Sequence, residues 1–232
     1  MAFDPAAIGG LVTREVRAGV RDGVATRTVV ARRVYPASQA DLWDALTNPE
    51  RIPRWFLPVS GDLRAGGRYQ LQGNAGGVVE ACREPESFAV TWEFGPTRSW
   101  LAVTLTPDGG QTALELAHEA PVDPEMWEQF GPGAVGVGWD LALIGLGLHL
   151  DSGGAVDPAR ATAFPASPEG TAFILASAAD WGVAAIAGGD QPDAARGAAA
   201  RTAAFYTPPA AGAGAGDGDG PAGAGPGDPA GR

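Results

Sequence analysis

Six short strand-like segments follow one another between residues 59 and 118, and this run limits the possible fold more than any other feature of the chain. The breaks between the segments are rich in glycine or proline, which is typical of tight turns. Connections this short join antiparallel neighbours, because a parallel crossover needs about a dozen residues or more. The sequence therefore predicts an antiparallel meander with strands at residues 59–63, 67–72, 77–83, 88–94, 100–106 and 112–118.

A long amphipathic helix is expected after the last of these strands. Before the meander, residues 24–35 are rich in β-branched side chains and predict a long first strand, while residues 39–46 and 49–55 predict two short helices. These elements predict an α+β fold in which one helix closes an antiparallel sheet. The inner face of that helix, with apolar residues at the period of a helix, would carry Val135, Trp139, Leu143, Leu146 and Leu150.

Composition divides the chain into four parts. The first residues mix charges with glycine, which predicts a loosely held lead-in with a short helix near residues 11–18. We expect Phe173, Trp181 and Phe205 to pack a helical extension onto the main domain, since short alanine-rich helices are marginal alone. The last residues are mostly glycine, alanine and proline and predict a disordered tail. The expected parts are a lead-in (1–23), a domain (24–152), an extension (153–207, with helices at 168–187 and 192–206) and a tail (208–232).

The charge of the chain excludes several classes of function. Its 232 residues carry a formal charge of −11, from 16 arginines (there is no lysine) and 27 acidic residues. Neither a nucleic acid nor an anionic membrane would attract such a chain. No run approaches the roughly 18 apolar residues of a membrane span, and the first residues lack the features of a signal peptide. We therefore expect a cytoplasmic protein that binds neither nucleic acid nor membrane.

Residue usage also limits the chemistry. Cys82 is the single cysteine, which excludes an internal disulfide and a cysteine-cluster zinc site. The lack of lysine excludes Schiff-base chemistry, and His118 and His149 are too few for a three-histidine metal site. Residues 131–136 match a Gly-x-Gly-x-x-Gly fingerprint, but no strand precedes them, so they are interpreted as a turn into the long helix. We expect no cofactor and no metal.

Four stretches of the sequence together resemble a known superfamily. They are PASQADLWDALTNPERIPRWF (36–56), RAGGRY (64–69), GGVVEACREPESFAVTWEF (76–94) and GVGWDLALIGLGLHL (136–150). In order and content they are similar to the SRPBCC superfamily, in its START-like branch of heat-shock-protein-90 ATPase activator homologues, over about residues 24–150. The resemblance implies a helix-grip fold, in which a curved antiparallel sheet wraps around a long C-terminal helix. Residues 169–207 resemble an extension of actinobacterial members, for which no activity is implied.

For function, the resemblance implies a cavity between sheet and helix that holds a hydrophobic small molecule. We expect an intracellular binding protein of this kind, with polyketide cyclase-like turnover as a less favoured option. The alternative is a co-chaperone-type module that stimulates an ATPase through a protein partner; the oligomeric state is left open. The candidate cavity wall consists of Trp55, Tyr69, Leu71, Glu80, Phe88, Trp92, Trp100, His118, Trp139, Leu143 and Leu146.

Strand alternation leaves two questions open. It groups Glu80 with Cys82 on one face, and Val79 with Ala81 on the other, but does not say which face is concave. If Glu80 or His118 points inward, either could orient a ligand carbonyl or act as a general base. Otherwise the first is a solvated carboxylate and the second a hydrogen-bonded histidine at a sheet edge. The tryptophans can likewise form a solid core or the wall of a pocket that stacks flat apolar ligands.

Overall fold

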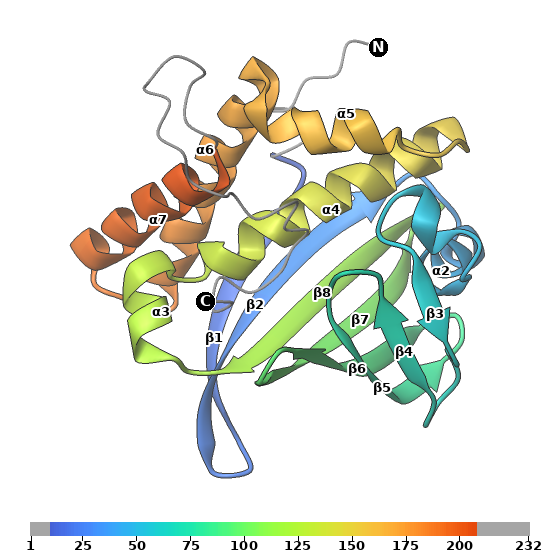
Figure 1. Ribbon diagram of the computed structural model, residues 1–232, viewed down its shortest axis with the longest axis horizontal. Coiled ribbons are helices and arrows are strands. Elements are labelled where there is room, and N and C mark those ends of the chain that lie inside the picture. The colour runs from blue at the N-terminus through green and yellow to red at the C-terminus, as the bar shows by residue number, and fades with distance from the viewer. Residues whose placement is uncertain (1–9, 208–232) are drawn as a thin grey trace.

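The computed structural model describes residues 10–207, so the tail expected at 208–232 lies outside the described residues. Eight strands in this part of the chain form one antiparallel sheet in the order β1-β2-β8-β7-β6-β5-β4-β3 (Figure 1). The predicted meander is confirmed, because β3 to β8 are neighbours in sequence order. The strands are β1 (Thr13–Arg21), β2 (Val24–Tyr35), β3 (Val59–Gly61), β4 (Arg68–Leu71), β5 (Gly76–Arg83), β6 (Ser87–Phe94), β7 (Thr97–Asp108) and β8 (Gln111–Pro121).

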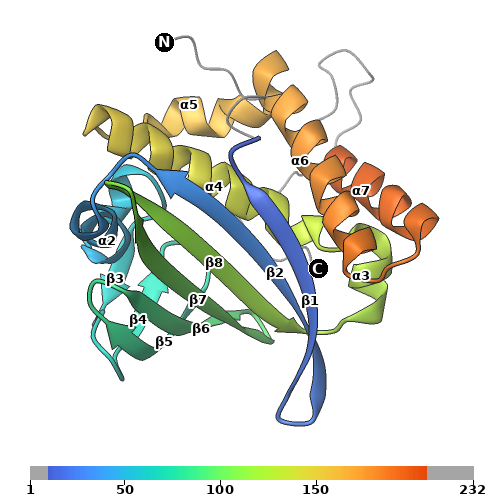
Figure 2. The same ribbon diagram turned by 180° about the vertical axis from the view of Figure 1, so that it is seen from behind.

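The sheet curves around one long helix, α4, and the helical extension covers the other side of that helix (Figures 1 and 2). The predicted α+β helix-grip fold is therefore confirmed. Both long helices predicted for the extension are present at the expected residues. The helices are α2 (Gln39–Thr47), α3 (Pro124–Phe130), α4 (Gly133–Ser152), α5 (Pro158–Ala163), α6 (Pro168–Ala187) and α7 (Pro192–Tyr206), with short 3-10 turns η1 (Ile52–Arg54) and η2 (Phe164–Ala166).

The first strand shows that the predicted lead-in at residues 1–23 is wrong for its second half. Residues 13–21 form β1, not a helix, and pair with β2 over the whole length of β1. The hairpin turns at Asp22 and Gly23, which have positive φ angles of 52° and 79°. Asp-Gly favours this two-residue turn because both positions need positive φ. The sheet domain therefore begins at β1 and not at residue 24.

Pleating gives the sheet an apolar concave face and a charged convex face. On the concave face Val103 of β7 lies opposite Leu116 of β8, and both are buried under α4 and α2. On the convex face Arg32 donates to Glu15 (2.7 Å) and to Glu115 (2.6 Å) on the neighbouring strands. The side of the sheet that faces α4 is therefore the apolar one.

The extension packs on the outer side of α4 through close contacts and one buried carboxylate. A side chain at Gly136 would overlap the Trp181 indole, so this glycine lets α6 lie close to α4. Asp140 Oδ2 accepts hydrogen bonds from Arg14 Nε (2.9 Å), Ser177 Oγ (2.6 Å) and Trp181 Nε1 (3.1 Å). Burial raises the pKa of Asp140, while Arg14 and the other donors oppose that rise. The Asp140 carboxylate and its three donors thus join β1, α4 and α6.

Two of the three aromatic residues expected to pack the extension are buried. Phe173 and Trp181 are each 1% exposed. Phe205 also contacts the domain, but it is 50% exposed and not buried. Phe205 lies on the outer side of α7, where its ring centroid is 5.4 Å from that of Phe130 on α3. It therefore covers the edge of the packing between α3 and α7 and is not part of the core.

Helices α4 and α6 show that the sequence-based exclusion of a membrane-spanning segment was too strong. By length and composition alone both qualify, with a mean hydropathy of 1.4 each. However, 67% of the apolar window of α4 and 50% of that of α6 are buried inside the protein. A core helix that packs on several sides is apolar for the same reason, and the packing of α4 between sheet and extension explains its composition.

Candidate functional site

A cavity of about 320 Å³ lies between the concave face of the sheet and the inner side of α4. Pockets that hold drug-sized ligands start at about 300 Å³. Strands β3 to β8 form its floor, α4 its roof, and α2 with η1 one of its ends. The wall consists of Trp43, Leu46, Thr47, Ile52, Trp55, Phe56, Val59, Leu63, Tyr69, Leu71, Val79, Cys82, Glu84, Phe88, Val90, Trp92, Leu101, Val103, Leu114, Leu116, Trp139, Ala142, Leu143 and Leu146.

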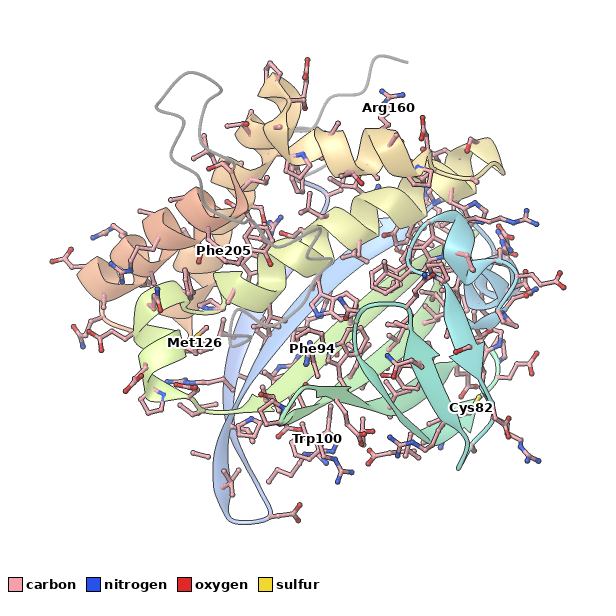
Figure 3. The ribbon with its side chains drawn as sticks, in the orientation of Figure 1. Cys82, Phe94, Trp100, Met126, Arg160 and Phe205 are labelled. Carbon is pink, nitrogen blue, oxygen red and sulfur yellow. The ribbon has the colours of Figure 1, made fainter. Side chains whose placement is uncertain are left out.

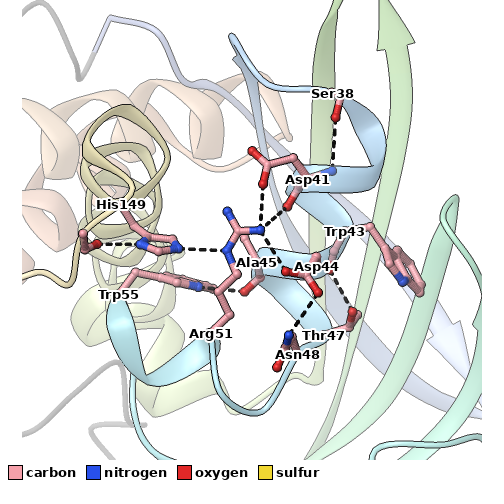
Figure 4. Close-up of polar contacts among 11 residues, drawn as sticks. Ser38, Asp41, Trp43, Asp44, Ala45, Thr47, Asn48, Arg51, Trp55 and His149 are labelled. Carbon is pink, nitrogen blue, oxygen red and sulfur yellow. Dashed lines mark hydrogen bonds and ion pairs between the residues drawn. The ribbon is translucent and has the colours of Figure 1, made fainter.

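A polar network fixes the end of the cavity near α2 (Figure 4). Arg51 Nη1 donates to Asp44 Oδ2 (2.9 Å), and Arg51 Nε donates to His149 Nε2 on α4 (3.0 Å). The Arg51 guanidinium also lowers the pKa of Asp44. Trp55 Nε1 donates to Ala45 O (2.9 Å), which holds the Trp55 indole against the C-terminal half of α2. These bonds join α2 and η1 to the last turns of α4.

The polar atoms on the deep wall are already hydrogen-bonded within the protein. Tyr69 Oη donates to Thr91 O, and Thr47 Oγ1 donates to Trp43 O, both at 2.8 Å. Burial raises the pKa of Tyr69 well above its usual value, so its hydroxyl remains a donor. The deep wall therefore offers carbon surface to a bound molecule and not hydrogen-bond partners.

Three aromatic rings, from Trp92 on β6, His118 on β8 and Trp139 on α4, close the inner end of the cavity; we call them the aromatic septum. Their centroids lie 5.1, 5.8 and 5.9 Å apart. Trp139 Nε1 donates to His118 Nδ1 (3.0 Å), so the neutral imidazole carries its proton on Nε2, which lies 2.8 Å from Ser99 Oγ. Ser99 Oγ donates in turn to the Trp92 carbonyl (3.1 Å). Burial lowers the pKa of His118 to about 4, which keeps the ring neutral at physiological pH.

The structure brings most of the predicted wall residues together and separates three of them from the cavity. His118 lies behind the wall, within the septum, with both ring nitrogens occupied. The prediction is wrong for Glu80 and Trp100, which lie on the convex face. Glu80 Oε1 is 3.6 Å from Arg98 Nη2, and the Trp100 ring lies beneath the Arg21 guanidinium, on the far side of the sheet from α4 (Figure 3). The residues at the cavity are Trp55, Tyr69, Leu71, Phe88, Trp92, Trp139, Leu143 and Leu146.

A β-bulge explains why strand alternation fails in β5. The register of β5 against β6 shifts between Val79 and Ala81, and such a bulge changes the phase of the alternation. Val79 and Cys82 consequently both line the cavity, although strict alternation assigns them to opposite faces, and Glu80 is left on the exposed side. Trp100 obeys ordinary alternation, since its neighbour Leu101 faces the cavity.

Sequence reasoning missed two features of the roof and the end wall. Phe56 stacks between Trp55 (5.4 Å) and Trp139 (6.2 Å); its position beside Trp55 in an apolar stretch was a usable signal. Arg33 Nη1 and Tyr35 Oη both donate to the Leu143 carbonyl, at 2.8 and 2.9 Å. No local pattern predicts this contact, because β2 and α4 are more than a hundred residues apart in the chain.

The fold and its cavity define a class of protein. A curved antiparallel sheet closed around one long helix, with room between them, is a START-like helix-grip protein. Residues 36–150 match the family model described as Activator of Hsp90 ATPase homolog 1-like protein. The chain belongs to this family, within the SRPBCC superfamily that its sequence resembles.

Solved structures of CalU16 from Micromonospora echinospora are similar to this chain. The solution structure is 31% identical, covers 76% of this chain and 96% of that chain, and has a TM-score of 0.62. The crystal structure is 32% identical, covers 61% of this chain and 87% of that chain, and has a TM-score of 0.53. A comparison with curated proteins finds no match.

Proposed function

We propose that the chain binds a neutral, apolar small molecule in the cavity between the sheet and α4. The observation that carries this proposal is a void of about 320 Å³ with a mainly carbon wall. A ligand in such a site gains about 0.8 kcal/mol per buried methylene. A charged or strongly polar group would lose its hydration without finding a partner. The favoured ligands are therefore compact, flat and uncharged.

The wall also favours one orientation of the ligand. Cys82 and Glu84 are the exposed members of the wall, so they mark the mouth where the cavity meets solvent. Trp92 and Trp139 lie at the inner end, where their rings offer flat apolar surface. We expect a polar end of the ligand at the mouth and an aromatic or alicyclic body against the tryptophans.

Binding without turnover is the better-supported form of this function. A cyclase or hydrolase needs an acid or a base beside the reacting atoms. On the deep wall, the Tyr69 hydroxyl is bonded to Thr91 O, and His118 lies behind the septum with its nitrogens bonded to Trp139 and Ser99. The carboxylate of Glu84 and the thiol of Cys82 lie at the exposed mouth, away from the deep wall. Such a wall suits a carrier or a sequestering protein, and we expect it to act in the cytoplasm.

A second candidate is a co-chaperone-type module, because the family description names an activator of the Hsp90 ATPase. Such a module works through its surface and does not need a ligand-sized void. Two measurements separate the candidates: the ATPase rate of purified Hsp90 with and without this chain, and the binding titration below.

The binding proposal is tested with N-phenyl-1-naphthylamine, a neutral apolar dye whose fluorescence rises in apolar sites. The wild-type protein should bind the dye saturably. Leu143→Trp fills the cavity from its roof and should weaken binding at least tenfold without unfolding the protein, because filling a void is tolerated. Leu148→Trp is the matched control, since Leu148 lies on the same helix but is 37% exposed, and should bind like the wild type.

Two outcomes would contradict the proposal. Equal binding by Leu143→Trp and the wild type would locate the dye elsewhere. An unfolded Leu143→Trp protein together with no saturable binding by the wild type would mean that the interior is solid. The co-chaperone candidate would then be the stronger one.

A further inference from the structure

We propose that the aromatic septum sets the length of the ligand that this protein accepts, by separating the cavity from a second chamber under α4. This inference rests on the proposed function, since it concerns which apolar molecules enter the same site. It assigns His118 a positioning role, although His118 does not line the first cavity.

The second chamber has a volume of about 150 Å³ and lies on the far side of the septum. Phe94 and Met126, both labelled in Figure 3, line it from β6 and α3. Arg27 of β2 and Val135 of α4 lie on its other walls, and Trp92 lines both chambers. A single ring system therefore separates the two spaces.

Both chambers lie in a row beneath α4. The helix contributes Leu146, Leu143 and Trp139 to the first chamber and Val135 to the second. At 1.5 Å per helical residue, the segment from Trp139 to Leu146 spans about 10 Å, and that from Val135 to Leu146 spans about 16 Å. Opening the septum would therefore lengthen the space by about 6 Å.

Directed hydrogen bonds and ring packing together hold the septum closed. His118 accepts the Trp139 indole N–H on one ring nitrogen, and its other nitrogen lies 2.8 Å from Ser99 Oγ. Ser99 then donates to the backbone carbonyl of Trp92. His118 thus couples the tryptophan of the roof to the tryptophan of the floor, and buried bonds of this kind are costly to leave unmade. These bonds fix the Trp139 ring, and the Trp92 ring is held by packing against the Trp139 and His118 rings, whose centroids lie 5.1 and 5.8 Å away.

The septum consequently selects the shape of the ligand. A compact ring system fits within the first chamber, whereas a long acyl chain would reach the rings and have to fold back. Beyond the rings, the second chamber again offers apolar surface, from Phe94, Met126 and Val135, but a chain gains this surface only if the septum opens. The structure points to compact apolar molecules as ligands and against long-chain lipids.

A homologous series of straight-chain primary alcohols, from hexanol to hexadecanol, tests this inference by competition with N-phenyl-1-naphthylamine. In the wild type, affinity should rise about fourfold per methylene while the chain lies in the first chamber, and should stop rising once the chain reaches the septum. A rise that continues unchanged to hexadecanol would overturn the inference.

Two septum variants sharpen the test. Trp92→Ala removes the ring that lines both chambers, and His118→Leu removes the acceptor that holds Trp139; each should extend the rise in affinity by several methylenes. Leu143→Ala enlarges the first chamber without changing a residue of the septum. In this variant, affinity should stop rising at the same alcohol chain length as in the wild type. If Trp92→Ala fails to fold, the inference is still tested by His118→Leu and by the chain length at which affinity stops rising in the wild type.

The outcomes distinguish this inference from the proposed function. Folded septum variants that bind the dye but keep the wild-type limit would overturn the role of the septum alone. A limit that moves equally in Leu143→Ala would do the same. A wild-type protein that binds neither dye nor alcohols would overturn both proposals.

Discussion

The two faces of α4 are packed in opposite ways. The inner face borders a void of about 320 Å³, and Ala142 and Leu143 lie on its wall. The outer face is filled, because a side chain at Gly136 would overlap the Trp181 indole and one at Gly133 would contact Thr202 too closely. Small residues therefore have opposite consequences on one helix: Gly136 permits close approach of another helix, whereas Ala142 leaves room.

The polar groups beside the two faces of α4 also differ. On the outer face, buried Asp140 accepts bonds from β1 and α6. At the cavity wall and in the septum, neutral groups bond to backbone or to each other, as Tyr69 and His118 do, and the buried Arg33 guanidinium of β2 donates to the Leu143 carbonyl. A void forfeits contacts that a filled interior would make. The dense outer face offsets that loss and fixes the position of α4, so the roof of the cavity does not depend on filling the cavity.

The largest expected effect comes from the packed face. Trp181→Ala should lower the free energy of unfolding by about 3–5 kcal/mol, since it leaves a large hole and removes a donor to Asp140. Urea unfolding followed by circular dichroism measures this. Leu175→Ala on the same helix is the control, because Leu175 is 53% exposed and should cost less than about 0.5 kcal/mol. An unchanged midpoint for Trp181→Ala would show that the extension does not stabilise α4.

The septum should make stability depend on pH. The pKa of His118 is about 4 in the folded protein and about 6.5 in an unfolded chain, so the unfolded state binds more protons between these values. The contribution of His118 is therefore fully present above pH 6.5 and is lost as the pH falls toward 4. The loss amounts to about 3 kcal/mol over that window.

The variant His118→Gln isolates this effect, because the surface carboxylates titrate in both proteins. Unfolding free energies measured at several pH values between 4 and 7 should fall more steeply with acid in the wild type than in the variant. Parallel curves would mean that His118 is solvated, and the septum would not be a closed wall.

Local sequence patterns predicted most of the fold, because strand and helix ends follow glycine, proline and capping residues. The two long helices of the extension and the strand at residues 24–35 are present at the predicted residues. Strand β1 was missed although the Asp22-Gly23 turn signal was visible, since its polar residues pack through partners in β2, α4 and α6 that are distant in the chain. Helix α3 was missed because it is short, despite Asp123 as N-cap.

The cavity wall was harder to predict than the fold, since it depends on partners distant in the chain. Residue type does not distinguish Trp92, which lies at the septum, from Trp100, which lies on the convex face. The face on which each tryptophan lies depends on the register of its strand against the neighbouring strands. The bulge after Val79 changes the face of β5 without a local signal such as glycine. The contact of His118 with Trp139 is a tertiary event that no spacing predicts.

A single methyl group should also distinguish the two faces of α4. Gly136→Ala improves helix propensity, which alone would stabilise the protein by about 0.5–1 kcal/mol. The new methyl group, however, overlaps the Trp181 indole, which its bond to Asp140 holds in place. We expect overpacking to dominate, with a net loss of about 1–3 kcal/mol in urea unfolding. A gain in stability would show that α6 moves away easily and that the outer face is not tightly packed.

The smallest effect on stability is expected for Ala142→Leu, although this change adds three carbons where Gly136→Ala adds one. Ala142 is buried and lines the cavity, so the larger side chain enters existing space and gains contacts there. The free energy of unfolding should change by less than about 1 kcal/mol, while the affinity for N-phenyl-1-naphthylamine falls because the cavity is smaller. If Ala142→Leu destabilises the protein as much as Gly136→Ala does, the inner face is packed like the outer one, and no room for a ligand exists beneath α4.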